Sequence, residues 1–491
     1  MEHMNEEIAA LEPQALWENF ARLNAVPRPS KKEAQVQAFM RSFLEELGLD
    51  YVQDEIGNII AQKPASPGYE NRKKVVLQAH LDMVCQKNAD TDFDFEKQGI
   101  NMHIDGDWVK AQGTTLGADN GIGVAAIMAV LASSSIPHPP LEALFTTDEE
   151  AGMTGAHHLK PGALSGDILM NLDTEDDDEL SIGCAGGIDT DISWSAHTQP
   201  MPAAAESWRI EVRGLQGGHS GMDIIHGRGN ANKILTRLLV GLPEELGLQV
   251  QLIEGGSLRN AIPRESEAWV AVPQGQIEPL KAHWDQLIVD LKKEFATTAP
   301  NLQINYRKED NPGAPLSSAD SARLLWALQA CPDGIRRLSP DVEDLVETSN
   351  NLARVQLKDG VLEAKCLTRS DRESAKHDHA QAVAAPFRLL GAKVEHSGAY
   401  PGWKLDPQAP MLAIMRDLYQ ELFSAEPRVI ACHAGLECGL LGQHHPHLEM
   451  ISFGPTIRDP HSPDEKVSIP SVQKFWHYFQ EALKRIPAKA A

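Results

Sequence analysis

Hydrophobic and polar residues follow two different patterns along this chain. In its first 186 residues, apolar side chains recur at helical spacing over 16–26 and 32–48. Short runs rich in Val, Ile and Leu follow, and they predict strands at 57–62, 73–80, 141–147 and 167–173. Strands that alternate with helices favour a largely parallel sheet covered on both faces. The pattern returns near the end of the chain, with a strand at 448–454 and an amphipathic helix at 471–486.

The middle of the chain, from 187 to 400, has another order of elements. Two sets with the order β-α-β-β-α-β follow one another, and the second set lacks a clear first strand. The first set covers 207–214, 231–242, 248–255, 265–272, 277–295 and 302–307, and the second covers 318–330, 352–359, 361–370, 371–390 and 392–400. We therefore expect an α/β domain built from residues 1–186 and 401–491. The section 187–400 would be an inserted α+β domain that duplicates one unit.

Length and composition restrict the class of protein. At 491 residues the chain exceeds the size of a single hydrophobic core, so two domains are expected. No apolar segment approaches the roughly 20 residues of a membrane span, and the acidic N-terminus lacks the order of a signal peptide. The six cysteines form no C-x-x-C pair and are typical of reduced thiols. These features favour a cytoplasmic protein.

The formal net charge of -24 argues against nucleic acid and anionic membranes as partners, because both attract clustered Lys and Arg. It suits the binding of cations.

The segment 117–126, GADNGIGVAA, contains the dinucleotide-binding spacing G-x-G-x-x-A at Gly121, Gly123 and Ala126. That motif needs an apolar strand that leads directly into the glycines, whereas the residues before Gly117 are polar. The carboxylate of Asp119 would also repel a phosphate. A cation site is therefore favoured over a nucleotide site, although saturable binding of NAD would restore the nucleotide hypothesis.

Residue types that bind metals stand at the ends of predicted strands. They are His80, Asp148 to Glu150, Asp173 and, in the C-terminal section, His461. The carboxyl ends of strands in an open α/β sheet meet at one edge, so these side chains are expected to converge there. Asp119, at a helix N-terminus, is expected at the same edge. The opening loop of that helix is therefore predicted to bind metal.

Imidazole and carboxylate ligands suit a pair of zinc ions, and one carboxylate can bridge the two. Asp119 is the candidate bridge. In an extended strand the side chains of His80 and Asp82 point the same way, so Asp82 can orient the imidazole. Of the adjacent Glu149 and Glu150, one can point at the metals, and the other can take a proton from a bridging water as general base.

Five motifs together resemble a known family, the co-catalytic di-zinc metallopeptidases that include carboxypeptidase G-like enzymes, aminoacylases and carnosinases. The motifs are HLD at 80–82, GADNGIG at 117–123, TTDEEAGMTGA at 146–156, NLDTE at 171–175 and DPHSPDE at 459–465. Within this family, the segments GGHSGMDI, CHAGLECG and FGPTIRDPHSPDE look most like the cytosolic aminoacyl-histidine dipeptidases. The resemblance covers nearly the whole chain and implies a peptidase domain with the inserted domain as its lid.

The resemblance also implies roles for single residues. One zinc ion would be bound by His80, Asp119 and Asp173, and the other by Asp119, Glu150 and His461, with Co²⁺ or Mn²⁺ as substitutes. Glu149 would be the general base, and Asp82 would support His80. In the lid, His219 would polarise the scissile carbonyl, and the substrate would be bound by Asn260, Arg369 and Gly435. The peptide bond between Asp119 and Asn120 would be cis.

The activity implied by the resemblance is zinc-dependent hydrolysis of small unblocked dipeptides that end in histidine, including β-Ala-His. Two alternatives are open: a di-zinc N-acyl-amino-acid deacylase on the same fold, and a non-catalytic zinc-binding scaffold. Arg369 lies in the second set of the inserted domain and Asn260 in the first, which departs from the single-copy lids of the family. A doubled lid leaves both a monomer and a homodimer open.

Overall fold

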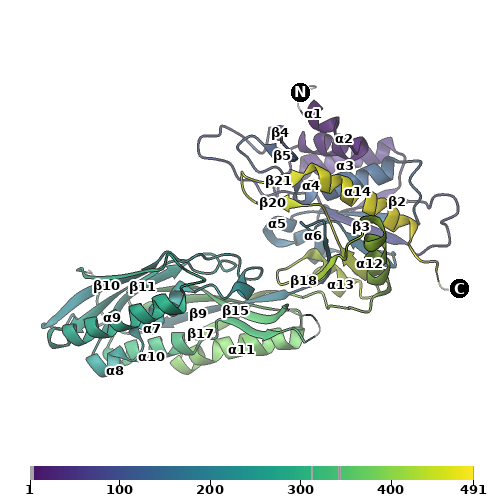
Figure 1. Ribbon diagram of the computed structural model, residues 1–491. Helices are drawn as coiled ribbons and strands as arrows, with labels where there is room; N and C mark the ends of the chain where they lie inside the picture. The colour runs from purple at the N-terminus through teal and green to yellow at the C-terminus, as the bar shows by residue number, and fades with distance from the viewer. Residues whose placement is uncertain (1–4, 311–312, 341, 343, 490–491) are drawn as a thin grey trace. The chain divides into compact units, whose positions relative to one another are not determined.

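The chain forms two compact units in the structure, a computed structural model that describes residues 5–310, 313–340, 342 and 344–489 (Figure 1). The first unit consists of Met1–Gly183, Trp403–Ala431 and Glu437–Ala491, and the second of Cys184–Gly402 and Cys432–Leu436. The segment Cys432–Leu436, which the sequence assigned to the first domain, packs within the second unit. There the Ala185 N–H donates to the carbonyl of Cys432 at 2.9 Å.

An eight-stranded sheet forms the centre of the first unit. Its strands, in spatial order, are β1 (Tyr51–Gln53), β2 (Ile59–Lys63), β6 (Leu141–Thr146), β3 (Val75–His80), β7 (Ile168–Asn171), β19 (Glu449–Ser452), β8 (Glu179–Cys184) and β18 (Arg428–Cys432). The four strands β6, β3, β7 and β19 run parallel, and β2 and β8 run antiparallel to their inner neighbours. Every residue of β3, β6 and β7 is buried, as expected for parallel strands covered on both faces.

Helices of the first unit pack on this sheet and on each other. They include α1 (Glu6–Ala9), α2 (Gln14–Asn24), α3 (Ala34–Glu46), α4 (Ala118–Ala132), α12 (Pro410–Phe423) and α14 (Ile469–Lys484). Helix α4 packs against β3 and α2, and α12 packs against β19 and α14. Because α4 is apolar around almost its whole circumference, it is buried along nearly its full length. Among the described residues, no helix combines the length and the apolar character that a membrane span requires.

A small antiparallel sheet in the first unit brings the C-terminal segment next to an early hairpin. Its strands are β20 (Ile457–Arg458), β21 (Lys466–Ser468), β5 (Trp108–Ala111) and β4 (Met102–Asp105). Val467 lies opposite Val109 in the pairing of β21 with β5. The loop between β20 and β21 contains His461, so this pairing places that loop beside the segment that leads into α4.

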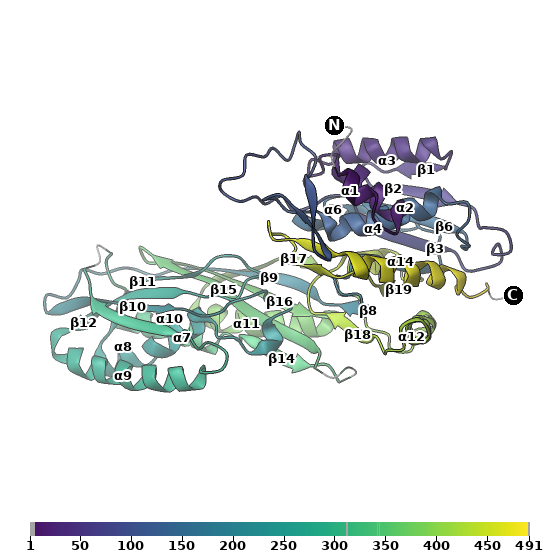
Figure 2. The same ribbon diagram turned by 45° about the horizontal axis from the view of Figure 1, so that its top comes forward.

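The second unit contains a nine-stranded antiparallel sheet (Figure 2). Its strands are β13 (Gln303–Lys308), β10 (Ala205–Arg213), β12 (Ser266–Pro273), β11 (Gln249–Gly256), β15 (Val346–Lys358), β16 (Val361–Ser370), β9 (Gly186–Ser195) and β17 (Lys393–Tyr400), with β14 (Gly334–Leu338) paired to β15. The sheet has two halves, which meet where β11 pairs with β15. From that centre outward, β11-β12-β10-β13 and β15-β16-β9-β17 have the same strand order. The first strand that the second set lacked in the sequence is therefore β9, which precedes the first set in the chain.

The helices of the second unit lie along one face of its sheet (Figure 2). They are α7 (Ala231–Leu239), α8 (Leu242–Leu246), α9 (Ile277–Glu294), α10 (Ser318–Ala330) and α11 (Glu373–Leu390). Apolar residues from these helices and from both halves of the sheet form one hydrophobic core, with Trp284 and Phe387 fully buried in it. The second unit therefore has a core of its own.

Candidate metal centre

The carboxyl ends of three neighbouring parallel strands bring acidic and imidazole side chains together in the first unit. His80 is the last residue of β3, and Asp173 follows β7 by two residues. Beyond the end of β6, the short helix α5 (Glu149–Gly152) begins with Glu149 and Glu150. Since β6, β3 and β7 are adjacent and parallel, these residues lie at one edge of the sheet.

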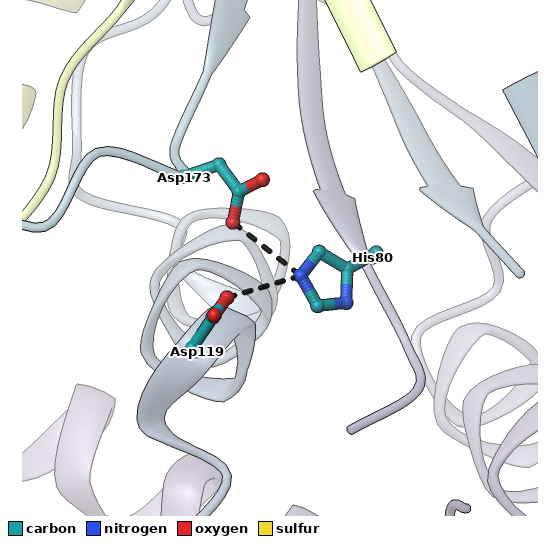
Figure 3. Close-up of side chains that lie close together, drawn as sticks. All are labelled: His80, Asp119 and Asp173. Atoms are coloured by element: carbon teal, nitrogen blue, oxygen red, sulfur yellow. Dashed lines mark hydrogen bonds and ion pairs between the residues drawn. The ribbon is translucent and has the colours of Figure 1, made fainter. Parts of the chain in front are cut away.

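Asp119 lies between two imidazoles, one on each of its oxygens. His80 Nε2 is 3.1 Å from Asp119 Oδ1 and 3.4 Å from Asp173 Oδ1 (Figure 3). His461 Nε2 is 3.2 Å from Asp119 Oδ2 and 3.0 Å from Glu150 Oε2. A carboxylate whose oxygens face two separate groups of ligands has the arrangement required of a bridge. The peptide bond between Asp119 and Asn120 is cis.

The side chains form groups that could each hold one cation. Ligand atoms lie within 4.8 Å of one another in four such groups of described residues, which are His80–Asp119–Asp173, Asp119–Glu150–His461, His80–Glu149–Glu150 and Glu33–Asp82–Asp148. The Oε1 atom of Glu150 is buried and accepts no hydrogen bond from the described residues. Buried carboxylate oxygens without donors are costly unless a cation binds them. The donor set of imidazole nitrogen and carboxylate oxygen therefore fits divalent metal ions.

The shifted pKa values of the cluster also indicate that it stabilises positive charge. Burial raises the pKa of Glu149 well above its ordinary value, and burial together with the Asp119 charge raises the pKa of Glu150 to about 7. Burial would also raise the pKa of Asp119, but hydrogen bonds from His461 and His80 outweigh it and lower that pKa. Hydrogen bonds to Asp119 and Glu150 raise the pKa of His461 to about 11. Crowded carboxylates thus stabilise any cation placed among them.

Asp82 supports the cluster from behind His80, as its position two residues further along the chain predicted. Its Oδ1 atom is 3.4 Å from His80 Nδ1 and accepts a hydrogen bond from the Glu149 N–H at 3.0 Å. Its Oδ2 atom accepts hydrogen bonds from the Glu150 N–H at 3.2 Å and the Ser30 hydroxyl at 2.7 Å. One buried carboxylate therefore connects the end of β3 to the start of α5.

A ladder of buried polar side chains crosses the same strand ends, and the sequence analysis did not identify it. Gln78 on β3 donates to Thr146 on β6 at 3.1 Å and accepts from Asn171 on β7. Glu437, the first residue of α13 (Glu437–His444), accepts from Gln78 at 2.6 Å and from Thr146 at 2.7 Å. Asn171 also accepts from the Ser452 hydroxyl on β19. Single polar residues inside otherwise apolar strands are the sequence feature that could have indicated this ladder.

The expected lid residues lie in the second unit. His219 Nδ1 accepts hydrogen bonds from the N–H groups of Gly221 at 3.2 Å and Met222 at 3.1 Å. Its Nε2 atom is 3.4 Å from the Nη2 atom of Arg369, a buried residue on β16 whose Nη1 donates to the Tyr400 hydroxyl at 2.9 Å. Strand pairing between the two halves of the sheet thus places Arg369 beside His219, although they belong to different halves of the unit.

Asn260 and Gly435 occupy loops of the second unit. The carbonyl of Asn260 accepts a hydrogen bond from the Ser220 N–H at 2.7 Å, which places Asn260 beside His219, and its side chain is exposed. Gly435 lies in the loop between β18 and α13, in the segment that packs within the second unit. In that segment His433 Nε2 is 2.8 Å from the Ser349 hydroxyl.

Comparisons with known proteins agree over nearly the whole chain. The family description "Peptidase family M20/M25/M40" matches residues 76–485. The cytosol non-specific dipeptidase of Escherichia coli (strain K12) is 45% identical over 483 residues, which are 98% of this chain and 100% of that protein. The crystal structure of aminoacylhistidine dipeptidase from Vibrio alginolyticus is 45% identical, with a TM-score of 0.91 over 100% of both chains. Aminopeptidase PepT from Bacillus cereus is 14% identical, with a TM-score of 0.56 over 97% of this chain and 99% of that one, and shares the fold.

Proposed function

Because this chain belongs to peptidase family M20/M25/M40, whose metallopeptidases depend on metal, we propose that it is a dipeptidase with two Zn²⁺ per chain. Its substrates would be small unblocked dipeptides that end in histidine, including β-Ala-His. The observation that supports this most strongly is the convergence of imidazole and carboxylate side chains from four other segments on Asp119. The free cysteines among the described residues suit a cytosolic enzyme.

The two groups that share Asp119 would hold the two ions. His80, Asp119 and Asp173 would bind one, and Asp119, Glu150 and His461 the other, and Co²⁺ or Mn²⁺ would substitute. When bound, such ions act as Lewis acids on the scissile carbonyl and make water a stronger nucleophile at neutral pH. Asp82 would fix the imidazole ring of His80 through the contact at its Nδ1 atom.

Glu149 would act as the general base. It precedes the ligand Glu150 on α5 and lies within 4.8 Å of His80 and Glu150, yet it is a member of neither group that shares Asp119. Its carboxylate can therefore remove a proton from the attacking water and pass it to the leaving amine. The Asp82 carboxylate holds the start of α5 through the backbone of both glutamates, which fixes the direction of this base.

The second unit would supply donors for the negative groups of the substrate. Since His219 Nδ1 accepts two backbone hydrogen bonds, we assign the ring proton to Nε2, the atom that faces Arg369. Two N–H donors that face each other are stabilised by an anion placed beside both. We assign His219 to the oxyanion, Arg369 to the terminal carboxylate, and Asn260 and Gly435 to the peptide backbone of the substrate.

Two variants of adjacent residues test the assignment of base and ligand. Glu149→Ala should keep the metal content of the wild type while kcat falls about 10³-fold or more, because only the proton transfer is lost. Glu150→Ala, the matched control on the same helix, should hold about one metal ion per chain because a ligand is lost. Metal content from atomic absorption and turnover of β-Ala-His are the measurements. If Glu149→Ala loses metal and Glu150→Ala keeps it, Glu149 is the ligand and Glu150 the base.

A substrate panel separates the dipeptidase from its alternatives. β-Ala-His and Ala-His should be hydrolysed and N-acetyl-His should not, because a dipeptidase requires the free amine. Hydrolysis of N-acetyl-His alone would identify a deacylase instead. Bound metal without hydrolysis of any of the three would identify a non-catalytic scaffold.

A further inference from the structure

Glu465 is a buried carboxylate four residues after His461, and no step of the proposed reaction uses it. It is only 2% exposed. Its Oε2 atom accepts hydrogen bonds from the N–H groups of Leu116 at 2.7 Å and Gly117 at 3.0 Å. Its Oε1 atom accepts from those of Ala118 at 2.8 Å and Asp119 at 3.3 Å. Four consecutive peptide groups, the last of them that of Asp119, thus donate to one side chain.

The N-cap residue of α4 provides no side-chain cap of its own. The first N–H groups of a helix have no partner within the helix, and the N-cap residue usually supplies a side-chain acceptor. Here the N-cap is Gly117, which has no side chain and a φ of 72°. A Cβ atom at this position would lie 2.4 Å from Arg28 Nη2, so the loop excludes a capping side chain of its own. The carboxylate of Glu465 takes that place. Because Asp119 and Asn120 have non-helical φ and ψ angles, Glu465 holds the turn that precedes the regular part of α4.

Arg28 holds the same loop through its carbonyl groups. This buried guanidinium donates from Nη2 to the carbonyl of Gly117 at 2.5 Å. From Nη1 it donates to the carbonyls of Leu81 at 3.2 Å and Asp82 at 3.1 Å, just after His80. Glu465 therefore accepts hydrogen bonds from the N–H groups of the loop, and Arg28 donates one to a carbonyl of the same loop. The two side chains carry opposite charges. The loop is fixed from both sides of its peptide chain.

We propose that Glu465 is a positioning residue of the metal centre, which holds the Asp119 loop at a fixed distance from His461. One side chain connects segments more than 340 residues apart, because Glu465 and His461 share the loop between β20 and β21 while Asp119 begins α4. The inference rests on the proposed metal-dependent function. Glu465 itself touches neither the substrate nor the ligand atoms.

Replacing Glu465 by glutamine tests the proposal. Glutamine keeps the shape of the side chain, but its NH₂ group would face two N–H donors where an oxygen now accepts from both. The loop must then shift, and Asp119 with it. A matched control is Glu142→Gln at the amino end of β6, because Glu142 is 1% exposed and accepts from the N–H groups of Ser165 at 3.0 Å and Gly166 at 2.9 Å.

The probe is Co²⁺, added to the metal-free full-length chain, with affinity from chelator competition and ligand geometry from the visible d–d spectrum. We expect Glu465→Gln to weaken Co²⁺ binding about tenfold or more and to alter the spectrum. Glu142→Gln should lower the melting temperature about as much as Glu465→Gln does, but it should leave the Co²⁺ affinity and the spectrum unchanged. Wild-type affinity and spectrum in Glu465→Gln would overturn the proposal.

Two further outcomes are informative. If Glu465→Gln does not fold, Glu465→Asp, which keeps the charge but is one methylene shorter, should show the same weakened affinity and altered spectrum, and wild-type values would overturn the proposal. If the wild type binds no Co²⁺, the proposed metal-dependent function fails and this inference fails with it. Normal Co²⁺ binding in both the wild type and Glu465→Gln would refute only the positioning role.

Discussion

At the scale of single residues, Asp82 uses both oxygens of one buried carboxylate to organise three neighbours. It contacts the imidazole of His80 and accepts from the backbone of Glu149 and Glu150, so the two proposed ligands and the proposed base all depend on it. Its bond from Ser30 completes its acceptor capacity.

The substitution Asp82→Asn should therefore reduce kcat about 10²-fold or more and weaken metal binding about 10- to 100-fold. The new NH₂ group would face a backbone N–H that now donates to oxygen, which disturbs the start of α5. Steady-state kinetics and metal competition measure the two effects. Ser30→Ala is the control, since it removes one hydrogen bond to the same carboxylate and should change kcat only severalfold. Equal effects of both variants would contradict this role for Asp82.

A second prediction at this scale concerns His433, which is buried beside Ser349 in the second unit. Burial, together with the Arg369 charge, lowers its pKa to about 3. The unfolded chain binds a proton near the ordinary pKa of about 6.5 while the folded chain does not, so this group lowers stability as pH falls below about 6.5. His433→Gln should remove up to about 1.4 kcal/mol per pH unit from the slope of unfolding free energy between pH 6 and 4. Urea unfolding at several pH values checks this, and an unchanged slope would show that His433 is not the titrating group.

At the scale of elements, the parallel strands of the first unit end in a shared polar ladder directly before the proposed ligands. Gln78 stands at its centre, between Thr146, Asn171 and Glu437. A leucine at this position would leave the amide NH₂ group of Asn171 without the acceptor it has in Gln78, and Glu437 Oε2 would keep the bond from Thr146 but lose the bond from Gln78. Because unpartnered buried polar groups cost about 1 to 3 kcal/mol each, Gln78→Leu should destabilise the fold by about 3 kcal/mol.

Gln62→Leu on β2 is the matched control, since Gln62 makes a single bond to Glu142 at 3.1 Å and is only partly buried. It should cost less than about 1 kcal/mol. Denaturant unfolding of the two variants in parallel measures the difference. Similar losses would mean that the ladder adds nothing beyond ordinary side-chain packing.

The elements that the sequence predicted well are those whose pattern is local. Helical spacing located α9, α10 and α14 closely, and apolar runs that end in His80 and Asp173 located β3 and β7. The strand β15 was predicted from 352 but begins at Val346, because residues such as Thr348 and Asn350 are polar yet buried. They are paired across the sheet to Ser370 and Thr368, which no local pattern shows. Glu465 was missed for the same reason, since its partners lie more than 340 residues away.

At the scale of the whole molecule, each unit has its own core, and the proposed ligands all belong to the first unit. Metal binding should therefore stabilise the first unit alone. At metal concentrations 100 times the dissociation constant, the gain is about 2.7 kcal/mol for each ion bound. Removal of metal with EDTA should abolish hydrolysis and lower the melting temperature of one calorimetric transition, while the transition of the second unit stays in place.

Addition of Zn²⁺, Co²⁺ or Mn²⁺ should restore both activity and the lost transition. Calorimetry of the metal-free and metal-loaded chain provides the test, with His80→Ala as the control in which added metal no longer shifts the transition. An equal shift of both transitions would show that the two units unfold as one.

The position of β9 in the chain sets the order in which the second unit can assemble during synthesis. The strands from β10 to β13 are complete once residue 308 has left the ribosome, and they can pair at once. Among the strands of the second unit, β9 is made first, yet both of its neighbours, β16 and β17, are made last. Until then its two edges are open to foreign strands, a known route to aggregation. Asp189 and Asp191, alternate residues of β9, place charge on the nascent strand and would discourage such pairing during that wait.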